Sequence, residues 1–219
     1  MLLIIKKETK VAKVVTFANV KGGSGKSTLC INMAAILVRA GYSVAIIDAD
    51  QQKCSQDWIT GTKDKLLSRV EIIEPVELKV AEDVEVDFLL IDTQGSLTKE
   101  MAQFLLQSSL IITPCRASRD DIVGQGWIEV FLKQSNQNIK KAPILTVLNG
   151  VNKRSSILSH VIEQLKEDGV KVAETCISQR VCFAETNVNK ISVIGYNKHA
   201  TKEIVDLTNE ALNLIKSEV

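Results

Sequence analysis

The stretch KGGSGKST at residues 21–28 constrains the fold more than any other part of the sequence. Its three glycines carry no side chains, so the backbone N–H groups of this loop can turn inward and close on a phosphate. Lys26 supplies a positive charge for the β and γ phosphates of a nucleotide, and Ser27 supplies a hydroxyl for Mg²⁺. The loop lies between an apolar run at residues 11–18 and a helix-length segment at residues 26–39, where phosphate can meet a helix N-terminus. The sequence therefore predicts a P-loop nucleotide site.

This loop departs from the usual pattern at its front. The signature G-x-x-x-x-G-K-[ST] requires a glycine at position 20, where the chain has Val20. The signature does not require a lysine at position 21, where the chain has Lys21. The alternative interpretation is a glycine turn that binds nothing. The GKS that follows and the flanking strand and helix favour the phosphate loop.

Short apolar runs alternate with helix-length amphipathic segments along the whole chain. This pattern is typical of an α/β fold, and we expect a mostly parallel, twisted sheet of about seven strands with helices on both faces. The expected strands are residues 11–18, 43–47, 70–73, 86–91, 110–113, 144–148 and 170–173. The expected helices are residues 26–39, 98–107, 155–166, 198–216 and one after Ser118, where Asp121 would complete a capping box.

The chain has 219 residues, which suits one domain, residues 1–219, with an N-terminal extension at residues 1–10 whose role is open. Its net charge of +1 means that any contact with nucleic acid has to come from a local patch. The five cysteines have no C-x-x-C spacing, which argues against a structural zinc site and a secreted disulfide framework. No stretch approaches the roughly 20 apolar residues that cross a bilayer. We therefore expect a cytosolic protein with reduced, mostly buried thiols and no membrane partner.

Three aspartates follow two of the predicted strands. Asp48 and Asp50 end SVAIIDAD, and Asp92 ends the strand within VDFLLIDTQG. Because ligands bind beyond the carboxyl ends of parallel strands, these side chains should gather beside the phosphate loop. One of them can hold Mg²⁺ through its water shell, and another can position the attacking water. Taken singly, each is as well explained as a helix cap or a turn former.

The motifs KGGSGKST, IIDADQQ, LLIDTQG and TPCRASRDDIVG, with the C-terminal RVCFAE and ATKEIVDLTNEAL, resemble those of the deviant Walker A ATPases of the ParA/MinD group. The similarity runs from Val14 onward and is strongest to the small ParA partition proteins, which lack an added DNA-binding domain. It implies a cytoplasmic, nucleoid-associated ATPase that partitions or positions plasmid, chromosomal or protein cargo. Such proteins form an ATP-dependent homodimer, bind DNA without sequence preference, and are stimulated by a ParB-like or other adaptor protein.

The same resemblance assigns roles to individual residues. Lys21 reaches across the dimer to the phosphates of the neighbouring subunit, and Asp50 positions the attacking water, so Lys21, Lys26 and Asp50 form the implied catalytic set. Ser27 contacts Mg²⁺, with Asp48 and Asp92 acting through water. The implied ATP-binding residues are Lys21, Gly22, Gly23, Ser24, Gly25, Lys26, Ser27, Thr28 and Asn149. Asn149 lies where related nucleotidases touch the base, although a plain turn asparagine explains it equally well.

Two departures from the family pattern concern the loops beside the phosphate site. Gln51 stands where the family usually has proline in D-x-D-P-Q, and the loss of rigidity could shift Asp50 and slow hydrolysis. The segment DTQG also differs from the commoner D-T-P. Neither change removes a charged group, so the resemblance still implies an ATPase.

Several basic residues are candidates for the DNA contact that the resemblance implies. They are Lys153, Arg154, Arg180, Lys198 and Lys202. The alternative is that they are solvated surface charges. Only Arg180 matches a region where the family carries DNA contacts.

Two other functions compete with the partition hypothesis. One is a metabolic P-loop enzyme that passes the γ-phosphate to a small molecule, like relatives of dethiobiotin synthetase; such an enzyme has no need of Lys21. The other is a MinD-like regulator recruited to membranes. The C-terminal segment argues against it, because one stripe of that segment is apolar and its other face is acidic, as in a helix packed on its own domain. Trp58 and Trp127 are expected in core or interface packing.

Overall fold

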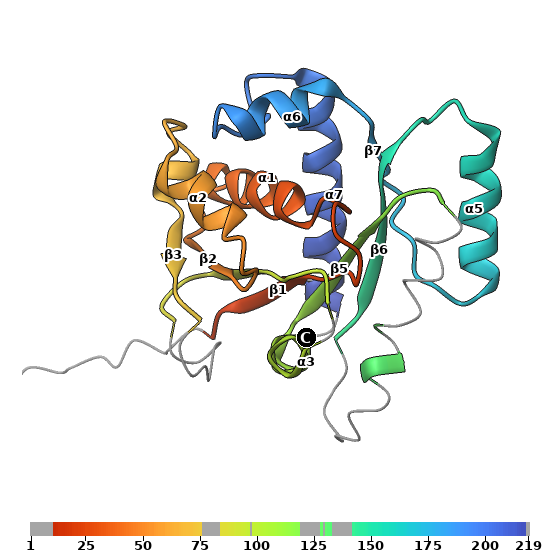
Figure 1. The fold of residues 1–219 in the computed structure, drawn as a ribbon, viewed down its shortest axis with the longest axis horizontal. Coiled ribbons are helices and arrows are strands. Elements are labelled where there is room, and N and C mark those ends of the chain that lie inside the picture. The colour runs from red at the N-terminus through yellow and green to blue at the C-terminus, as the bar shows by residue number, and fades with distance from the viewer. Residues whose placement is uncertain are drawn as a thin grey trace, which may run out of the picture.

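A computed structural model describes residues 11–75, 84–96, 98–118, 128, 130–132 and 142–217. These residues form a seven-stranded sheet in the order β3-β2-β4-β1-β5-β6-β7, and every pair of neighbouring strands is parallel (Figure 1). The strands are β1 (Lys13–Phe17), β2 (Val44–Asp48), β3 (Glu71–Ile73), β4 (Phe88–Asp92), β5 (Leu110–Cys115), β6 (Ile144–Val151) and β7 (Ile177–Ser178). The predicted α/β fold is confirmed.

The helices cover both faces of this sheet (Figure 1). They are α1 (Lys26–Arg39), α2 (Cys54–Thr60), α3 (Lys99–Gln107), α5 (Ser156–Glu167), α6 (Val181–Val188) and α7 (Lys198–Ser217), with a short 3₁₀ helix η1 (Leu67–Arg69). Val15 and Phe17 of β1 pack with α1 and α7, whereas Val14 points to the opposite face, the side on which Phe104 of α3 lies. This alternation places a buried layer of side chains on each side of the central strands.

Helix α7 packs on its own domain, as its apolar stripe predicts. Ile204, Leu207, Ala211 and Ile215 are buried, and Leu214 is partly buried against the same core. Among the described residues, no helix combines the length and the apolar character that crossing a membrane requires. Cys54 is exposed, the other four cysteines are buried, and all five are free thiols.

The seventh strand differs from the prediction. Residues 170–173 were expected to form it, but they make only an isolated bridge, Thr146 with Val172, and β7 lies further on at Ile177–Ser178. Pairing does not continue past residue 173, because the carboxylate of Glu210 accepts the next two N–H groups, those of Glu174 and Thr175. The chain therefore leaves the edge of β6 after Ala173 and pairs with it again at Ile177.

The helix limits agree closely with the sequence where a capping side chain is present. The hydroxyl of Thr98 accepts the N–H of Met101 at the start of α3, and that of Ser155 accepts the N–H of Ile157 at the start of α5. Helices α2 and α6 lack a side-chain cap and were not anticipated. Ser118 is described and residues 128 and 130–132 are helical, but Asp121, Trp127 and residues 1–10 lie outside the described part of the chain.

Candidate functional site

The phosphate loop joins the central strand β1 to α1, at the carboxyl edge of the sheet. Gly23 and Gly25 adopt left-handed conformations, with φ of 71° and 95°, which non-glycine residues rarely adopt. Gly25 is the N-cap of α1, and its carbonyl accepts the N–H of Leu29. The first turn of α1 therefore begins at the loop, so that unpaired N–H groups of the helix face the space where phosphate would lie.

Three side chains hold the backbone of this loop: Asn19 and Arg116, which follow β1 and β5, and Asn149 of β6. The Asn19 amide donates to the Pro114 carbonyl at 2.6 Å, and its oxygen accepts the N–H of Lys21 at 2.9 Å. The Asn149 amide donates to the carbonyl of Ser24 at 2.7 Å, and the Arg116 guanidinium donates to that of Gly23 at 3.2 Å. The loop is thus fixed in its turn from β1, β5 and β6.

Asn19 and Arg116 were not among the predicted site residues. Arg116 directly follows β5 and Asn19 lies two residues after the end of β1, and this position beyond a strand that borders the site is the signal that could have identified them. The role predicted for Asn149, contact with the base, stays a prediction; the structure shows its amide against the loop. A Cβ at Gly25 would lie only 2.1 Å from the Asn149 amide nitrogen, so this contact also requires glycine there.

The two lysines of the loop differ in their surroundings. Lys26 is buried, and its ammonium donates to the Lys21 carbonyl at 3.4 Å. Burial lowers the pKa of Lys26, while the nearby charges of Asp92 and Asp50 act in the opposite direction. Lys21 is only half-buried at the front of the loop. Lys26 thus lies inside the site near two of the predicted aspartates.

Asp92 is the most buried carboxylate of the site. It ends β4 and is paired in register with Phe17 of β1 on one side and Asp48 of β2 on the other. Its Oδ2 accepts the hydroxyl of Ser55 at 2.6 Å, from the first turn of α2. Ser55 was not anticipated as a site residue, because nothing in its local sequence distinguishes it from other helix residues.

The charge of Asp92 is poorly compensated. Burial raises the pKa of Asp92 to about 6, and the neighbouring charge of Asp48 adds to this rise. Hydrogen bonds from Ser27 and Ser55 and the charge of Lys26 lower the pKa, but they only partly offset the rise. Its second oxygen, Oδ1, is buried and has no hydrogen-bond partner among the described residues. An unpaired buried carboxylate oxygen beside Ser27 is a suitable acceptor for a metal-bound water.

Asp48 organises the segment that follows β2. It is fully buried, and its two oxygens accept the N–H groups of Asp50 at 3.1 Å and Gln56 at 2.9 Å. Both oxygens are therefore already engaged by backbone. The predicted water-mediated contact of Asp48 with Mg²⁺ stays a prediction, whereas its role in placing Asp50 is visible.

Hydrogen bonds also fix the turn in which glutamine replaces the family's proline. The Asp50 carboxylate accepts the N–H of Gln52 at 2.9 Å, and the backbone carbonyl of Asp50 accepts the N–H of Lys53 at 3.0 Å. The Lys53 ammonium donates a hydrogen bond to the backbone carbonyl of Asp48 at 2.7 Å. These bonds restrict the backbone around Gln51 without a proline ring.

The segment after β4 packs directly on the phosphate loop. The hydroxyl of Thr93 donates to the carbonyl of Phe17 at 2.8 Å. A Cβ at Gly95 would lie 3.0 Å from the Gly22 nitrogen and 3.2 Å from the Lys21 carbonyl carbon, closer than side chains normally approach. The glycine of DTQG thus permits this close approach of two backbones.

These residues fit a magnesium–nucleotide complex. Mg²⁺ is usually held by one or two carboxylates together with waters and substrate phosphates. The described ranges contain no group of three or more His, Cys, Asp or Glu side chains that could hold a metal ion. Ser27 and the unpaired oxygen of Asp92 are the groups that would hold the ion beside a bound triphosphate.

A cavity of about 370 Å³ lies beside Asp50, on the side of α3. It is lined by Asp50, Gln51, Lys53, Glu100 and Phe104 among others. The cavity makes the predicted water-positioning carboxylate accessible from outside the phosphate loop.

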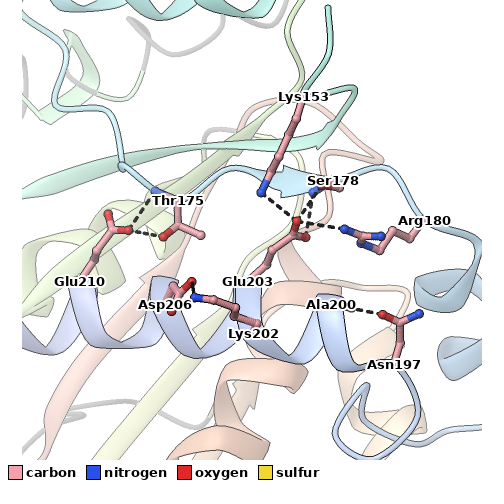
Figure 2. A network of polar contacts seen from close by, with 10 residues as sticks. All are labelled: Lys153, Thr175, Ser178, Arg180, Asn197, Ala200, Lys202, Glu203, Asp206 and Glu210. Atoms are coloured by element: carbon pink, nitrogen blue, oxygen red, sulfur yellow. Dashed lines mark hydrogen bonds and ion pairs between the residues drawn. The ribbon is translucent and has the colours of Figure 1, made fainter.

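The basic residues predicted to contact DNA have different environments. Lys153 and Arg180 both bind Glu203 of α7, and Lys202 pairs with Asp206 one turn along the same helix (Figure 2). Arg154 and Lys198 have no ion-pair partner among the described residues. All five positions lie away from the phosphate loop in sequence, and their contact with DNA stays a prediction.

Comparison with known proteins agrees with this geometry. The family model for the CobQ/CobB/MinD/ParA nucleotide binding domain matches residues 15–193. The chain is 26% identical over 211 residues to the maintenance of carboxysome distribution protein A of Halothiobacillus neapolitanus, covering 92% of this chain and 97% of that protein.

Solved structures share the fold over nearly the whole chain. A plasmid partition protein of Borrelia burgdorferi B31 bound to AMPPNP has a TM-score of 0.74 at 20% identity, covering 95% of this chain and all of that one. The septum site-determining protein MinD of Pyrococcus horikoshii OT3 with Mg-ADP has a TM-score of 0.67 at 17% identity, covering 91% and 96%.

Proposed function

Because the chain belongs to the CobQ/CobB/MinD/ParA nucleotide-binding family, we propose that it is an ATP-dependent dimerising ATPase that positions plasmid, chromosomal or protein cargo on the nucleoid. The observation that carries the proposal is a phosphate loop with two lysines, Lys21 and Lys26, beside the buried Asp92, one oxygen of which has no hydrogen-bond partner in the described part of the chain. The relative that acts in carboxysome distribution and the plasmid partition protein with AMPPNP support this choice of function.

Within one subunit, each group has a role that its position supports. Lys26 and the N–H groups at the start of α1 bind the phosphates, and Ser27 and Asp92 hold Mg²⁺, which when bound neutralises charge on the β and γ phosphates. Asp50 orients the attacking water. Asp48 accepts the N–H of Asp50, and this hydrogen bond keeps the Asp50 carboxylate at the edge of the site. Hydrolysis would release phosphate into solution.

The role of Lys21 requires a second subunit. In the proposed dimer its ammonium contacts the triphosphate bound by the partner and stabilises the charge that grows in the transition state. ATP binding and dimerisation would then be one event. An adaptor protein bound to the cargo would stimulate hydrolysis and return the protein to the monomer.

The ATP-bound dimer would bind the DNA backbone through basic side chains, without sequence preference. Such binding arises mainly from phosphate neutralisation and weakens steeply with salt. The candidates are Lys153, Arg154, Arg180, Lys198 and Lys202, and their charges, rather than any base-reading side chain, support a non-specific mode.

A second function has one observation in its favour. The cavity beside Asp50 has room for a small phosphoryl acceptor, as a metabolic P-loop enzyme would need. That enzyme would release little phosphate from ATP alone, whereas the proposed ATPase releases it without any small-molecule acceptor. Phosphate release from ATP, measured without a small-molecule acceptor and both with and without DNA, therefore separates the two functions.

The central test uses Lys21→Ala and Asp50→Ala, with Lys63→Ala as a control for an exposed lysine outside the site. With a non-hydrolysable ATP analogue, Lys21→Ala should bind nucleotide but elute as a monomer in size-exclusion chromatography. Asp50→Ala should dimerise with ATP itself and persist, because its hydrolysis is blocked. A wild-type chain that stays monomeric with the analogue, or rapid hydrolysis by Asp50→Ala, would contradict the proposal.

A further inference from the structure

Two carboxylates of α7 hold the chain segment between α5 and α6 (Figure 2). Glu210 accepts the N–H groups of Glu174 and Thr175, each at 2.9 Å, and also the Thr175 hydroxyl. Glu203, two turns earlier, accepts the N–H of Ser178 at 3.0 Å and its hydroxyl at 2.7 Å. Both glutamates therefore fix this segment to α7 by accepting its backbone N–H groups.

Glu203 differs from Glu210 because it also binds two cations. Its Oε1 accepts the Lys153 ammonium at 2.8 Å and the Arg180 guanidinium at 3.2 Å, which converge on it from the β6–α5 loop and the start of α6 (Figure 2). The glutamate side chain is 10% exposed, whereas those of Lys153 and Arg180 are 46% and 30% exposed. The carboxylate therefore lies beneath two cations that remain open to solvent.

The charge of this carboxylate is permanent under ordinary conditions. Burial alone would raise the pKa of Glu203, but hydrogen bonds from Lys153, Ser178 and Arg180 outweigh it and lower the pKa to about 2. The two cations and the carboxylate together carry a net charge of +1. A phosphate that approaches the exposed sides of Lys153 and Arg180 thus meets two donors whose attraction is reduced by one fixed negative charge.

We propose that Glu203 is an internal counter-ion that limits the binding of a nucleic-acid backbone to Lys153 and Arg180. This inference rests on the proposed DNA binding of the ATP-bound dimer. The ligand class follows from the donors, because an arginine and a lysine presented side by side are typical contacts of phosphodiester oxygens. The carboxylate keeps both side chains in place and at the same time weakens their hold on phosphate, which favours release from DNA.

Glutamine at position 203 separates these two effects. Its carbonyl oxygen can still accept from Lys153, Arg180 and the Ser178 hydroxyl, so the cations keep an acceptor beneath them. The negative charge is removed, and the acceptor for the N–H of Ser178 is lost. If Glu203 acts as a counter-ion, the variant binds DNA more tightly; if it only holds the fold, DNA affinity stays equal or falls.

The size of the effect follows from simple electrostatics. One negative charge about 6 Å from a bound phosphate, screened as at a protein surface, corresponds to a roughly three- to tenfold change in affinity. Removal of that charge also adds about one neutralised phosphate, which makes the slope of log affinity against log salt steeper by about 0.9.

The experiment compares wild type, Glu203→Gln and the matched control Glu210→Gln. Binding of each to a random-sequence DNA duplex is measured by fluorescence anisotropy with a non-hydrolysable ATP analogue, at several KCl concentrations. Glu203→Gln should gain roughly three- to tenfold in affinity with the steeper salt slope. Glu210→Gln removes an equal charge from the same helix, and Glu210 has no ion-pair partner among the residues that the structure describes, so this variant should bind as wild type.

The outcomes separate the inference from the proposed function. Absence of DNA binding by both wild type and Glu203→Gln would overturn the DNA-binding part of the proposed function and the inference with it. Binding by wild type that Glu203→Gln leaves unchanged or weakens would overturn the counter-ion role alone. An equal gain in both glutamine variants would show a general effect of net charge and likewise overturn it.

Discussion

Replacement of Asp92 by asparagine should stabilise the nucleotide-free protein, although it removes the carboxylate that we assign to magnesium. The reason is that the folded state buries this charge without full compensation. Its pKa is raised by burial, then by the Asp48 charge, from an ordinary 3.8 to about 6, and one oxygen has no partner among the described residues. A raised acid pKa means that the folded state favours the protonated form, so stability is lost as pH rises from about 4 through 6.

The magnitude follows from that shift. At about 1.4 kcal/mol for each pKa unit, the ionised side chain costs the folded state about 3 kcal/mol at neutral pH. Asparagine removes the charge and keeps a carbonyl oxygen for the hydroxyls of Ser55 and Ser27, but one charge-assisted contact weakens, so we expect a net gain of about 2 kcal/mol. The gain should disappear at about pH 4, where Asp92 is protonated in the folded wild type.

The assay is urea unfolding of wild type and Asp92→Asn in the presence of EDTA, at about pH 4, 6 and 8. The free-energy difference should grow from near zero to about 2 kcal/mol across that range. In parallel, the increase in ATP affinity that Mg²⁺ gives to wild type should be lost in the variant. A variant less stable than wild type at pH 8, or a difference independent of pH, would refute the burial argument.

Two further predictions concern Ser55, which donates to the buried carboxylate of Asp92, and the carboxylate of Glu203 itself. Ser55→Ala should weaken the Mg²⁺-dependent gain in ATP affinity and cost about 1.5–3 kcal/mol in urea unfolding, because a hydroxyl donor to a charged group is lost; Ser55→Thr should restore both, and a Ser55→Ala variant with full Mg²⁺ dependence would contradict the role. Glu203→Gln should be less stable than wild type by about 1–2 kcal/mol at neutral pH, a figure reduced for partial exposure. Since the pKa of Glu203 is lowered from 4.5 to about 2, that difference should be full above about pH 5 and vanish as pH falls to about 2, and acid unfolding that is identical in both proteins would contradict it.

The elements that the sequence predicts correctly are those whose signals are local. The strands that end at Phe17, Asp48 and Asp92 read as apolar runs because parallel strands are buried on both faces. Their adjacency then follows from topology, since the carboxyl ends of parallel strands share one edge of the sheet. The phosphate loop was recognisable for the same reason, because its glycines and Lys26 are consecutive.

What the sequence could not reveal depends on contacts between distant residues. The strand expected at residues 170–173 has the right composition, but Glu210, more than thirty residues later, takes the N–H groups that a longer strand would need. Asn19, Arg116 and Ser55 support the site through single hydrogen bonds to the loop or to Asp92, and no periodicity marks such residues. The pairing of Lys153 and Arg180 with Glu203 is likewise invisible without the fold.

Asp92 and Glu203 show how burial of a carboxylate distinguishes a ligand site from a structural one. Both carry a charge largely out of solvent, yet the pKa of Asp92 is raised to about 6 and that of Glu203 is lowered to about 2. The protein satisfies Glu203 completely with two cations, an N–H and a hydroxyl, so the fold gains from its ionisation. At Asp92 one oxygen has no partner within the residues that the structure describes, and burial of the charge lowers the stability of the fold, which a positively charged ligand would restore on binding. The carboxylate that the fold leaves incompletely paired is therefore the one at which a cation from outside the chain should bind.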